Sequence, residues 1–379
     1  MLSYWERQSF VHYDVVVIGS GIVGLSTALS LADRDPALNI AVLERGIFPA
    51  GASTRNAGFA CIGSFTEILD DLSHCPEDGV LQLIGMRIKG LKMLRHRLGD
   101  NVIGYGERGS YELISEQELP LLDRLNHVNR LLKAELQDNA FSLASKRIRD
   151  FGFDVGRVKA LVENHFEGEL HTGKMMQGLL QKAMQAGIAV KTGCAVRSLE
   201  EKKALVEIRV ADPLGKDALL LQAGQVAVCT NAFTKDLLPD VELKPGRGQV
   251  LVTEPVTDLR FRGIFHFDQG YYYFRELDGR VLLGGGRNLD FAGETTTDVA
   301  LNERIQRDLE EKLLTVILPG RDVRISWRWS GIMAFGREKF PLVTSYSDRI
   351  FLGARLGGMG VAIGSEVGER LALMMLQNR

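Results

Sequence analysis

The chain has few cysteines, few tryptophans and no excess of charge of either sign. Its 379 residues include 4 cysteines and 3 tryptophans, and 46 basic side chains stand against 48 acidic ones, for a net charge of −2. The cysteines show no C-x-x-C pair and no metal-type spacing, so they indicate free thiols in a reducing cytosol and no metal site. Because acids and bases are intermixed, the sequence argues against a nucleic-acid-binding protein.

Long hydrophobic runs are also scarce. One stretch, residues 15–32, lacks charge for 18 positions and is long enough to be mistaken for a membrane span. Its three glycines and the flanking Asp14 and Asp33 favour a strand, a turn and a helix instead. Glu6 precedes this stretch and argues against a cleaved secretory signal. We therefore expect a cytoplasmic protein without a membrane span, and the chain length predicts two domains.

A glycine motif follows the first strand that the sequence predicts. Residues 15–18 are apolar, residues 22–32 have helical periodicity, and the glycines follow the order G-x-G-x-x-G. The first glycine permits a tight turn, the second lets the backbone approach a pyrophosphate, and the third lets helix and strand pack closely. Free N–H groups at the helix start would face the phosphates. The predicted contact residues are Gly19, Ser20, Gly21, Ile22, Val23 and Gly24.

An acidic residue stands where the ribose of a dinucleotide is expected. Glu44 follows a second predicted strand, residues 40–43, and lies 20 residues beyond Gly24. Its carboxylate can accept hydrogen bonds from a ribose diol and would repel a 2′-phosphate, which disfavours NADP. Together, the glycine motif and Glu44 predict a dinucleotide-binding unit.

The rest of the chain predicts α/β structure at both ends and antiparallel strands in the middle. Predicted helices cover 79–98, 116–136, 173–186, 302–314 and 361–376, and the basic residues of the first, Arg87 among them, are expected to form a solvated face. Predicted strands cover 188–190, 195–199, 204–210, 225–230, 249–253, 271–275, 281–283 and 350–353. In a doubly wound sheet the ligand lies beyond the carboxyl ends of the strands, which would bring the glycine motif, Glu44, Thr230 and residues 355–360 together.

A second motif, Gly51-Ala-Ser-Thr-Arg-Asn-Ala-Gly58, suggests a family. Together with the glycine motif and later segments in matching order, it resembles the FAD-dependent amine and D-amino-acid oxidoreductases, which include glycine oxidase and sarcosine oxidase. The resemblance runs nearly end to end. The later segments are Leu170-His-Thr-Gly173, Ala195-Val196, Val226 to Ala232, Arg247-Gly-Gln249, Asp278 to Gly285, Trp329-Ser-Gly331, Phe340-Pro341 and Leu356-Gly-Gly-Met-Gly360.

The resemblance implies an α/β fold: a Rossmann-like FAD-binding domain of the glutathione-reductase type, with an inserted, mainly antiparallel β-sheet substrate domain flanked by helices. Residues 1–76, 150–240 and 322–379 would form the FAD-binding domain, and residues 77–149 and 241–321 the substrate-binding domain. One FAD would be bound non-covalently, since no cysteine lies near Met333, where sarcosine oxidase attaches its flavin. Besides the glycine motif, the implied FAD contacts are Glu44, Arg45, Ser53, Thr54, Arg55, Asn56, Ala57, Gly58, Val196, Thr230, Asn231, Leu356, Gly357, Gly358, Met359 and Gly360.

The implied reaction is oxidation of a C–N bond of an amine or amino acid by hydride transfer to flavin N5. The imine would hydrolyse, and O2 or another acceptor would reoxidise the flavin. Residues 271–274 fall where family members line the substrate cavity with aromatic side chains. Alternation puts Tyr272 and Phe274 on one side of a strand and Tyr271 and Tyr273 on the other, and of these we expect Tyr272 to face the cavity. Arg287 is the second candidate for a direct role in catalysis.

The basic residues that hold substrate carboxylates in relatives are missing. The glycine-oxidase arginines fall near Met333 and Gly358, those of sarcosine oxidase near Gly58 and Ala362, and its oxygen-activating lysine near Leu282. The substrate is then an amine without an α-carboxylate, as in the γ-glutamylputrescine oxidase branch, which also begins with a Tyr-Trp segment like Tyr4-Trp5. Alternatively, Arg287, Arg275, Arg337 or Arg355 binds a carboxylate. We favour the amine without an α-carboxylate.

Two other functions remain open. An NAD-dependent dehydrogenase would use only the first glycine motif and would leave residues 51–58 and 356–360 unexplained. A flavin-binding protein without turnover is kept open by the missing carboxylate-binding residues.

Overall fold

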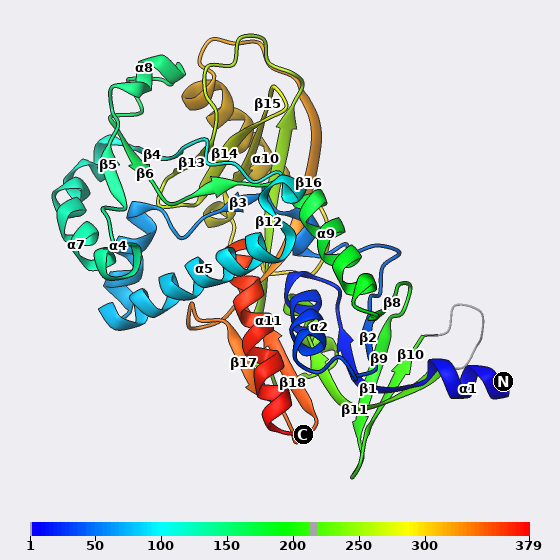
Figure 1. Cartoon of the computed structure of the whole chain (residues 1–379). Coiled ribbons are helices and arrows are strands. Elements are labelled where there is room, and N and C mark those ends of the chain that lie inside the picture. Colours follow the sequence, from blue (N-terminus) through cyan, green and yellow to red (C-terminus); the bar gives the residue numbers. More distant parts are fainter. Residues whose placement is uncertain (1, 212–217) are drawn as a thin grey trace.

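Two eight-stranded sheets organise the protein (Figure 1). The computed structural model describes residues 2–211 and 218–379. One sheet is mainly parallel and the other almost wholly antiparallel, which confirms the predicted fold class. No helix within the described residues is both long enough and apolar enough to cross a membrane.

The first sheet is built around β1 (His12–Ile18), which pairs in parallel with strands on both sides. Residues 15–18 are buried, as is typical of a parallel strand covered on both faces. The strand order is β17-β18-β11-β1-β2-β8, and a hairpin of β9 and β10 extends β11. The bounds are β2 (Ile40–Leu43), β8 (Ala189–Lys191), β9 (Val196–Glu201), β10 (Val206–Val210), β11 (Leu219–Val228), β17 (Leu342–Ser345) and β18 (Ile350–Ala354).

Helices cover one face of this sheet, and two of them, α2 (Ile22–Arg34) and α11 (Gly360–Gln377), lie side by side (Figure 1, blue and red). Gly368 makes their close approach possible, because a Cβ atom there would lie 2.6 Å from the Cβ of Ser26. The other two helices of this layer are α5 (Glu77–Leu98) and α9 (Thr172–Gln185).

The basic face expected on α5 is not wholly solvated. Arg87 is 5% exposed, and its guanidinium donates a hydrogen bond of 2.6 Å to the carbonyl of Ile62. The expectation was wrong at this residue because other elements, which helical periodicity does not reveal, pack over that side of α5.

The second sheet has the order β16-β12-β15-β14-β13-β4-β6-β5. Its strands are β4 (Ser110–Ile114), β5 (Phe141–Leu143), β6 (Ala160–Asn164), β12 (Lys244–Thr253), β13 (Ile264–Phe267), β14 (Tyr272–Leu277), β15 (Arg280–Gly285) and β16 (Ile325–Phe335). β6 and β16 belong to this sheet, although both fall within the ranges expected for the FAD-binding domain. The domain boundaries themselves stay a prediction.

The two faces of the second sheet differ in chemistry. On one face, aromatic rings form a core in which Phe265 stacks on Phe274 at 4.6 Å, beneath α10 (Glu303–Lys312). On the other face, cross-strand pairing aligns polar side chains, with His266 between Tyr273 and Glu112. This polar face points away from the aromatic core.

The remaining elements are short or connect the two sheets. They are α1 (Tyr4–Phe10), α3 (Ala52–Arg55), β3 (Phe59–Ala60), α4 (Phe65–His74), α6 (Asp100–Ile103), α7 (Leu125–Leu136), α8 (Arg147–Phe151), β7 (Gly168–Glu169), 3-10 helices over Glu116–Arg124, Asn231–Asp236 and Arg287–Leu289, and a π-helical turn over Leu313–Ile317. The helix predicted over 116–136 is a 3-10 helix up to Arg124 and α-helical only from Leu125. Pro120 lies in the first part and cannot donate an α-helical hydrogen bond.

Replacing Gly368 with valine should separate α2 from α11. We expect a loss of about 1–3 kcal/mol in the free energy of unfolding, because the added side chain meets backbone and Cβ atoms that cannot move aside. Leu373→Ala, on the exposed side of the same helix, is the matched control and should change stability by less than about 0.5 kcal/mol. Equal denaturant midpoints for the two variants would contradict the close packing described here.

Candidate cofactor and substrate site

A large cavity lies where the two sheets meet. Its volume is about 700 Å³, and residues from both sheets line it. This size falls within the range of about 300–1,000 Å³ that is usual for small-molecule sites. The first sheet contributes the segments that follow β1, β2, β11 and β18, as expected for a ligand at the carboxyl ends of parallel strands.

The glycine motif forms the turn between β1 and α2. Gly19 has φ of 101°, and a Cβ atom there would lie 2.7 Å from the carbonyl oxygen of Cys229. At Gly24, a Cβ atom would lie 1.9 Å from the carbonyl oxygen of Gly19. Both positions therefore require glycine for geometric reasons. Gly21 lines the cavity and caps α2 without a side chain.

Glu44 lies at the cavity wall just beyond β2. One carboxylate oxygen accepts hydrogen bonds from the Ser20 hydroxyl at 2.7 Å and the Ser20 N–H at 3.2 Å, and the other accepts from the Gly46 N–H at 2.9 Å. These bonds fix the orientation of the carboxylate. Ser20 is buried and does not line the cavity, so its observed role is to position Glu44.

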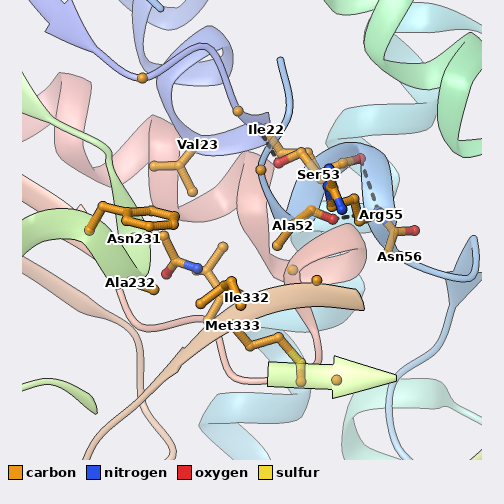
Figure 2. Close-up of a pocket in the computed structure, with 18 of the residues that line it drawn as sticks. Ile22, Val23, Ala52, Ser53, Arg55, Asn56, Asn231, Ala232, Ile332 and Met333 are labelled. Atoms are coloured by element: carbon orange, nitrogen blue, oxygen red, sulfur yellow. Dashed lines mark hydrogen bonds between the residues drawn. The ribbon is translucent and has the colours of Figure 1, made fainter. Parts of the chain in front are cut away.

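The loop over residues 51–58 contains one helical turn, α3, beside the start of α2 (Figure 2). The Ser53 hydroxyl oxygen accepts a hydrogen bond of 3.0 Å from the Ile22 N–H. Arg55 donates to the carbonyl of Ser330 at 2.8 Å and so joins this loop to the second sheet. The Asn56 side chain accepts from the Gly58 N–H at 2.8 Å.

Most residues predicted to contact a cofactor line the cavity. The exceptions are Ser20, Gly24, Thr54 and Gly58. The Thr54 hydroxyl instead donates to the carbonyl of Pro49 at 2.8 Å. Gly58 is packed so closely that a Cβ atom would lie 2.2 Å from the Leu170 carbonyl oxygen. These four residues shape the turns and loop around the cavity.

The closing loop, residues 355–360, brings the start of α11 to the cavity. Gly357 has φ of 55°, and a Cβ atom at Gly358 would meet nothing within 4 Å, so the backbone there is open to a ligand. The Asn231 side chain accepts a hydrogen bond of 3.1 Å from the Arg355 N–H and holds this loop beside the end of β11. Cys61, which was not predicted to lie here, lines the cavity with its sulfur 3.6 Å from that of Met359.

The expectation that Tyr272 faces the cavity is wrong. Tyr272 is 1% exposed, stacks on Phe267 at 4.9 Å and donates a hydrogen bond of 2.6 Å to Asp308. Its ring belongs to the aromatic core, whereas Tyr271 and Tyr273 line the cavity. The predicted alternation is present, but residue periodicity does not say which face of a sheet a cavity will occupy.

The structure separates the four candidate arginines. Three have partners outside the cavity. Arg275 donates to the carbonyl of Leu170 at 2.9 Å and lies 3.3 Å from Glu169. Arg337 lies 2.7 Å from Glu242 with its side chain 87% exposed, and Arg355 donates to the carbonyl of Phe340 at 2.9 Å. Only Arg287 of these four lines the cavity. It remains the one candidate of the set for contact with a substrate.

A family model described as DAO, FAD dependent oxidoreductase, matches residues 14–374. The chain therefore belongs to this family of FAD-dependent oxidoreductases, which confirms the resemblance in the sequence. It is 25% identical over 381 residues to gamma-glutamylputrescine oxidoreductase of Escherichia coli, an alignment that covers 96% of this chain and 83% of that protein.

Solved structures share the fold. L-proline dehydrogenase from P. horikoshii has a TM-score of 0.77 at 16% identity, with 97% of this chain and 94% of that chain covered. Glycine oxidase from Geobacillus kaustophilus has a TM-score of 0.76 at 18% identity, with 97% and 95% covered. These likenesses show the arrangement of a parallel FAD-binding sheet and a mainly antiparallel second sheet.

Glu112, on the polar face of the second sheet, provides a test by pH. Burial raises the pKa of its carboxyl from 4.5 to about 7, against the lowering effect of hydrogen bonds from Thr66 and Ser64. The folded protein therefore holds this proton more tightly than the unfolded chain. The resulting stabilisation is complete below pH 4.5 and is lost as the pH rises through about 7.

Between pH 5 and pH 8 we expect wild type to lose unfolding free energy relative to Glu112→Gln, which has no carboxyl group to titrate at this position. The upper limit of the shift is about 3 kcal/mol. Urea denaturation of both proteins at the two pH values measures it. Parallel stability curves would show that Glu112 is not protonated in the folded protein.

Proposed function

We propose that this protein uses FAD, bound non-covalently in the cavity, to oxidise a C–N bond of an amine or amino acid. The bound flavin supplies a hydride acceptor. The imine formed from the substrate would then hydrolyse, with reoxidation by O2 or another acceptor. The supporting observation is that one cavity runs from the glycine motif and Glu44 to the polar face of the second sheet.

The residues along the cavity fit an extended dinucleotide. Glu44 offers an oriented carboxylate for the ribose, and Gly21 offers backbone without a side chain beside the start of α2. Gly358 offers open backbone at the opposite loop, where its N–H group can stabilise negative charge on a reduced flavin, whereas the Gly357 N–H already donates to the carbonyl of Ala334 at 3.1 Å. A nicotinamide cofactor held at the first glycine motif alone would not account for the open backbone of the opposite loop.

The substrate end of the cavity combines aromatic walls with a few polar groups. Phe59 packs edge-on against both His266 and Tyr273, with centroid distances of 5.2 and 5.6 Å. Such a setting excludes water and favours the neutral form of an amine, the form that can lose a hydride. Burial raises the pKa of Tyr273 to about 12, so its hydroxyl is protonated at neutral pH and serves as a hydrogen-bonding group.

The amine specificity is also supported by the relatives. The E. coli relative is named for gamma-glutamylputrescine, and two structures with this fold are named for proline and glycine. All three names denote compounds that contain nitrogen. The acceptor that reoxidises the flavin is left open, because Leu282 stands where the oxygen-activating lysine of sarcosine oxidase was expected.

The purified protein should be yellow, with flavin absorbance near roughly 450 nm. Without oxygen, at least one member of a panel of amines and amino acids should bleach this band and yield an aldehyde or keto product. Bound flavin that no member of the panel reduces would instead favour a flavin-binding protein without turnover. Colourless protein that binds NAD would support a dehydrogenase.

Gly21→Val should abolish flavin binding. A Cβ atom at this position already lies 3.0 Å from the Ser53 hydroxyl, and the further methyl groups would occupy space beside the helix start that a pyrophosphate requires. We expect a folded but colourless protein, checked by circular dichroism and by the flavin-to-protein absorbance ratio. A wild-type flavin content in this variant would contradict the proposed position of the phosphates.

A further inference from the structure

One histidine lines the cavity at the end formed by the second sheet. His266 is 5% exposed, and its ring packs edge-on against Phe59 at a centroid distance of 5.2 Å. Among the residues that the structure describes, no other histidine lines the cavity. An imidazole is the side chain that most readily takes up and releases a proton near neutral pH. His266 is therefore the candidate for moving a proton in this cavity.

The two ring nitrogens of His266 have different surroundings. Nε2 is buried and has no hydrogen-bond partner in the described part of the chain. Nδ1 is not enclosed in this way, so it is the nitrogen that a ligand in the cavity can reach. A buried polar atom without a partner is uncommon in a folded protein and requires an explanation. A ring that gains a proton during a reaction provides one.

Glu167 supplies a buried carboxylate near His266. One of its oxygens accepts hydrogen bonds from the N–H groups of Ile62 at 2.7 Å and Gly63 at 2.9 Å. The other accepts from the Ser110 hydroxyl at 2.6 Å, and these donors favour the charged form of the carboxyl. Burial raises the pKa of Glu167, and His266 opposes that rise because it lies close by. The same closeness would stabilise a positive charge on the histidine.

The other titratable groups on the elements around His266 are acidic or neutral. Arg87, a cation of this region, is already engaged, since it donates to the Ile62 carbonyl and lies 3.9 Å from Asp71. The local charge therefore favours a cation at His266. The acidic and neutral groups are Glu112 on β4, Tyr273 on β14, Glu67 on α4, Cys61 after β3 and Glu167 before β7.

The reaction proposed above creates a need for a proton acceptor. An alkylamine in neutral water is almost wholly protonated, because its pKa resembles that of a lysine side chain. The ammonium ion has no lone pair to support loss of a hydride from the neighbouring carbon. Phe59 and Tyr273 make this end of the cavity aromatic, so a protein group has to take the place of water as the proton acceptor.

We propose that His266 accepts, at Nδ1, a proton from the ammonium group of the substrate, and that Glu167 stabilises the imidazolium so formed. One N–H bond of the ammonium breaks, one N–H bond forms at Nδ1, and no electrons are transferred. The inference rests on the proposed function and explains how a substrate that arrives protonated becomes a neutral amine. Glu67 is the alternative proton acceptor, but it already caps α4, and a carboxylate holds a proton less readily than an imidazole does.

Binding of tert-butylamine to the flavin-loaded protein tests this assignment without turnover. This amine has no hydrogen on the carbon that bears the nitrogen, so it cannot be oxidised. In wild type its proton would pass to His266, and the affinity should change little between pH 7 and pH 9. In His266→Gln the proton has to go to the solvent, so the affinity should rise by about tenfold per pH unit, as measured by titration calorimetry.

Flavin reduction by a substrate amine without oxygen gives a second test. At pH 7, His266→Gln should reduce its flavin about 10²-fold to 10⁴-fold more slowly than wild type, the usual contribution of a general base. At pH 10, where much of the amine arrives neutral, the deficit should fall below about tenfold. A histidine needed only for packing would leave the same deficit at both pH values.

Two further variants separate the roles. In Glu167→Gln the amide oxygen can still accept from Ile62 and Gly63, and the loss of charge should slow flavin reduction at pH 7 by roughly tenfold. His127→Gln is the matched control, because its side chain is 40% exposed on α7 and outside the cavity. It should match wild type at each pH.

Equal pH dependence of wild type and His266→Gln would overturn the assignment, and so would the same pattern in Glu67→Gln in place of His266→Gln. Failure of the proposed function would look different, as flavin that no amine reduces at any pH. In that case the binding of tert-butylamine would still decide whether His266 takes the proton of a bound amine.

Discussion

The structure depends on the way that the second sheet divides its two faces. Alternate residues of β13 and β14 point either into an aromatic core or toward the first sheet. A shift of β14 by one residue would therefore put Phe274 at the cavity in place of Tyr273. The stacked pair Phe265 and Phe274 holds the sheet in its register against α10. The polar face is then available to close the cavity at the carboxyl ends of the parallel strands.

The parts of the site that the sequence predicted are those with local backbone requirements. Gly19 and Gly24 are needed because any side chain there would collide with neighbouring backbone, and Glu44 follows directly from the length of one βαβ unit. The identity and spacing of these three residues within one short segment are enough to predict the cofactor-binding turn. The first sheet and its helices were therefore predictable nearly strand by strand.

The parts that the sequence did not predict depend on tertiary contacts. Periodicity placed Tyr272 and Tyr273 on opposite faces of a strand but did not show which face lies against the core. β16 was not predicted; most of its residues are only partly buried, and it is defined by its pairing with β12. The sequence alone could not distinguish among the four candidate arginines. The hydrogen bonds of Arg275 and Arg355 to distant carbonyls separate these two residues from Arg287. Such distinctions need the positions of segments far apart in the chain.

We propose that one flavin lies along the cavity and meets its substrate at the second sheet. A crystal structure of the flavin-loaded protein tests it most directly. We expect adenosine at Glu44, the pyrophosphate at Gly21, and the ring system between residues 356–360 and the wall that holds Tyr273. A flavin in the reverse direction, or a ring system outside this cavity, would show that the proposed binding mode is wrong.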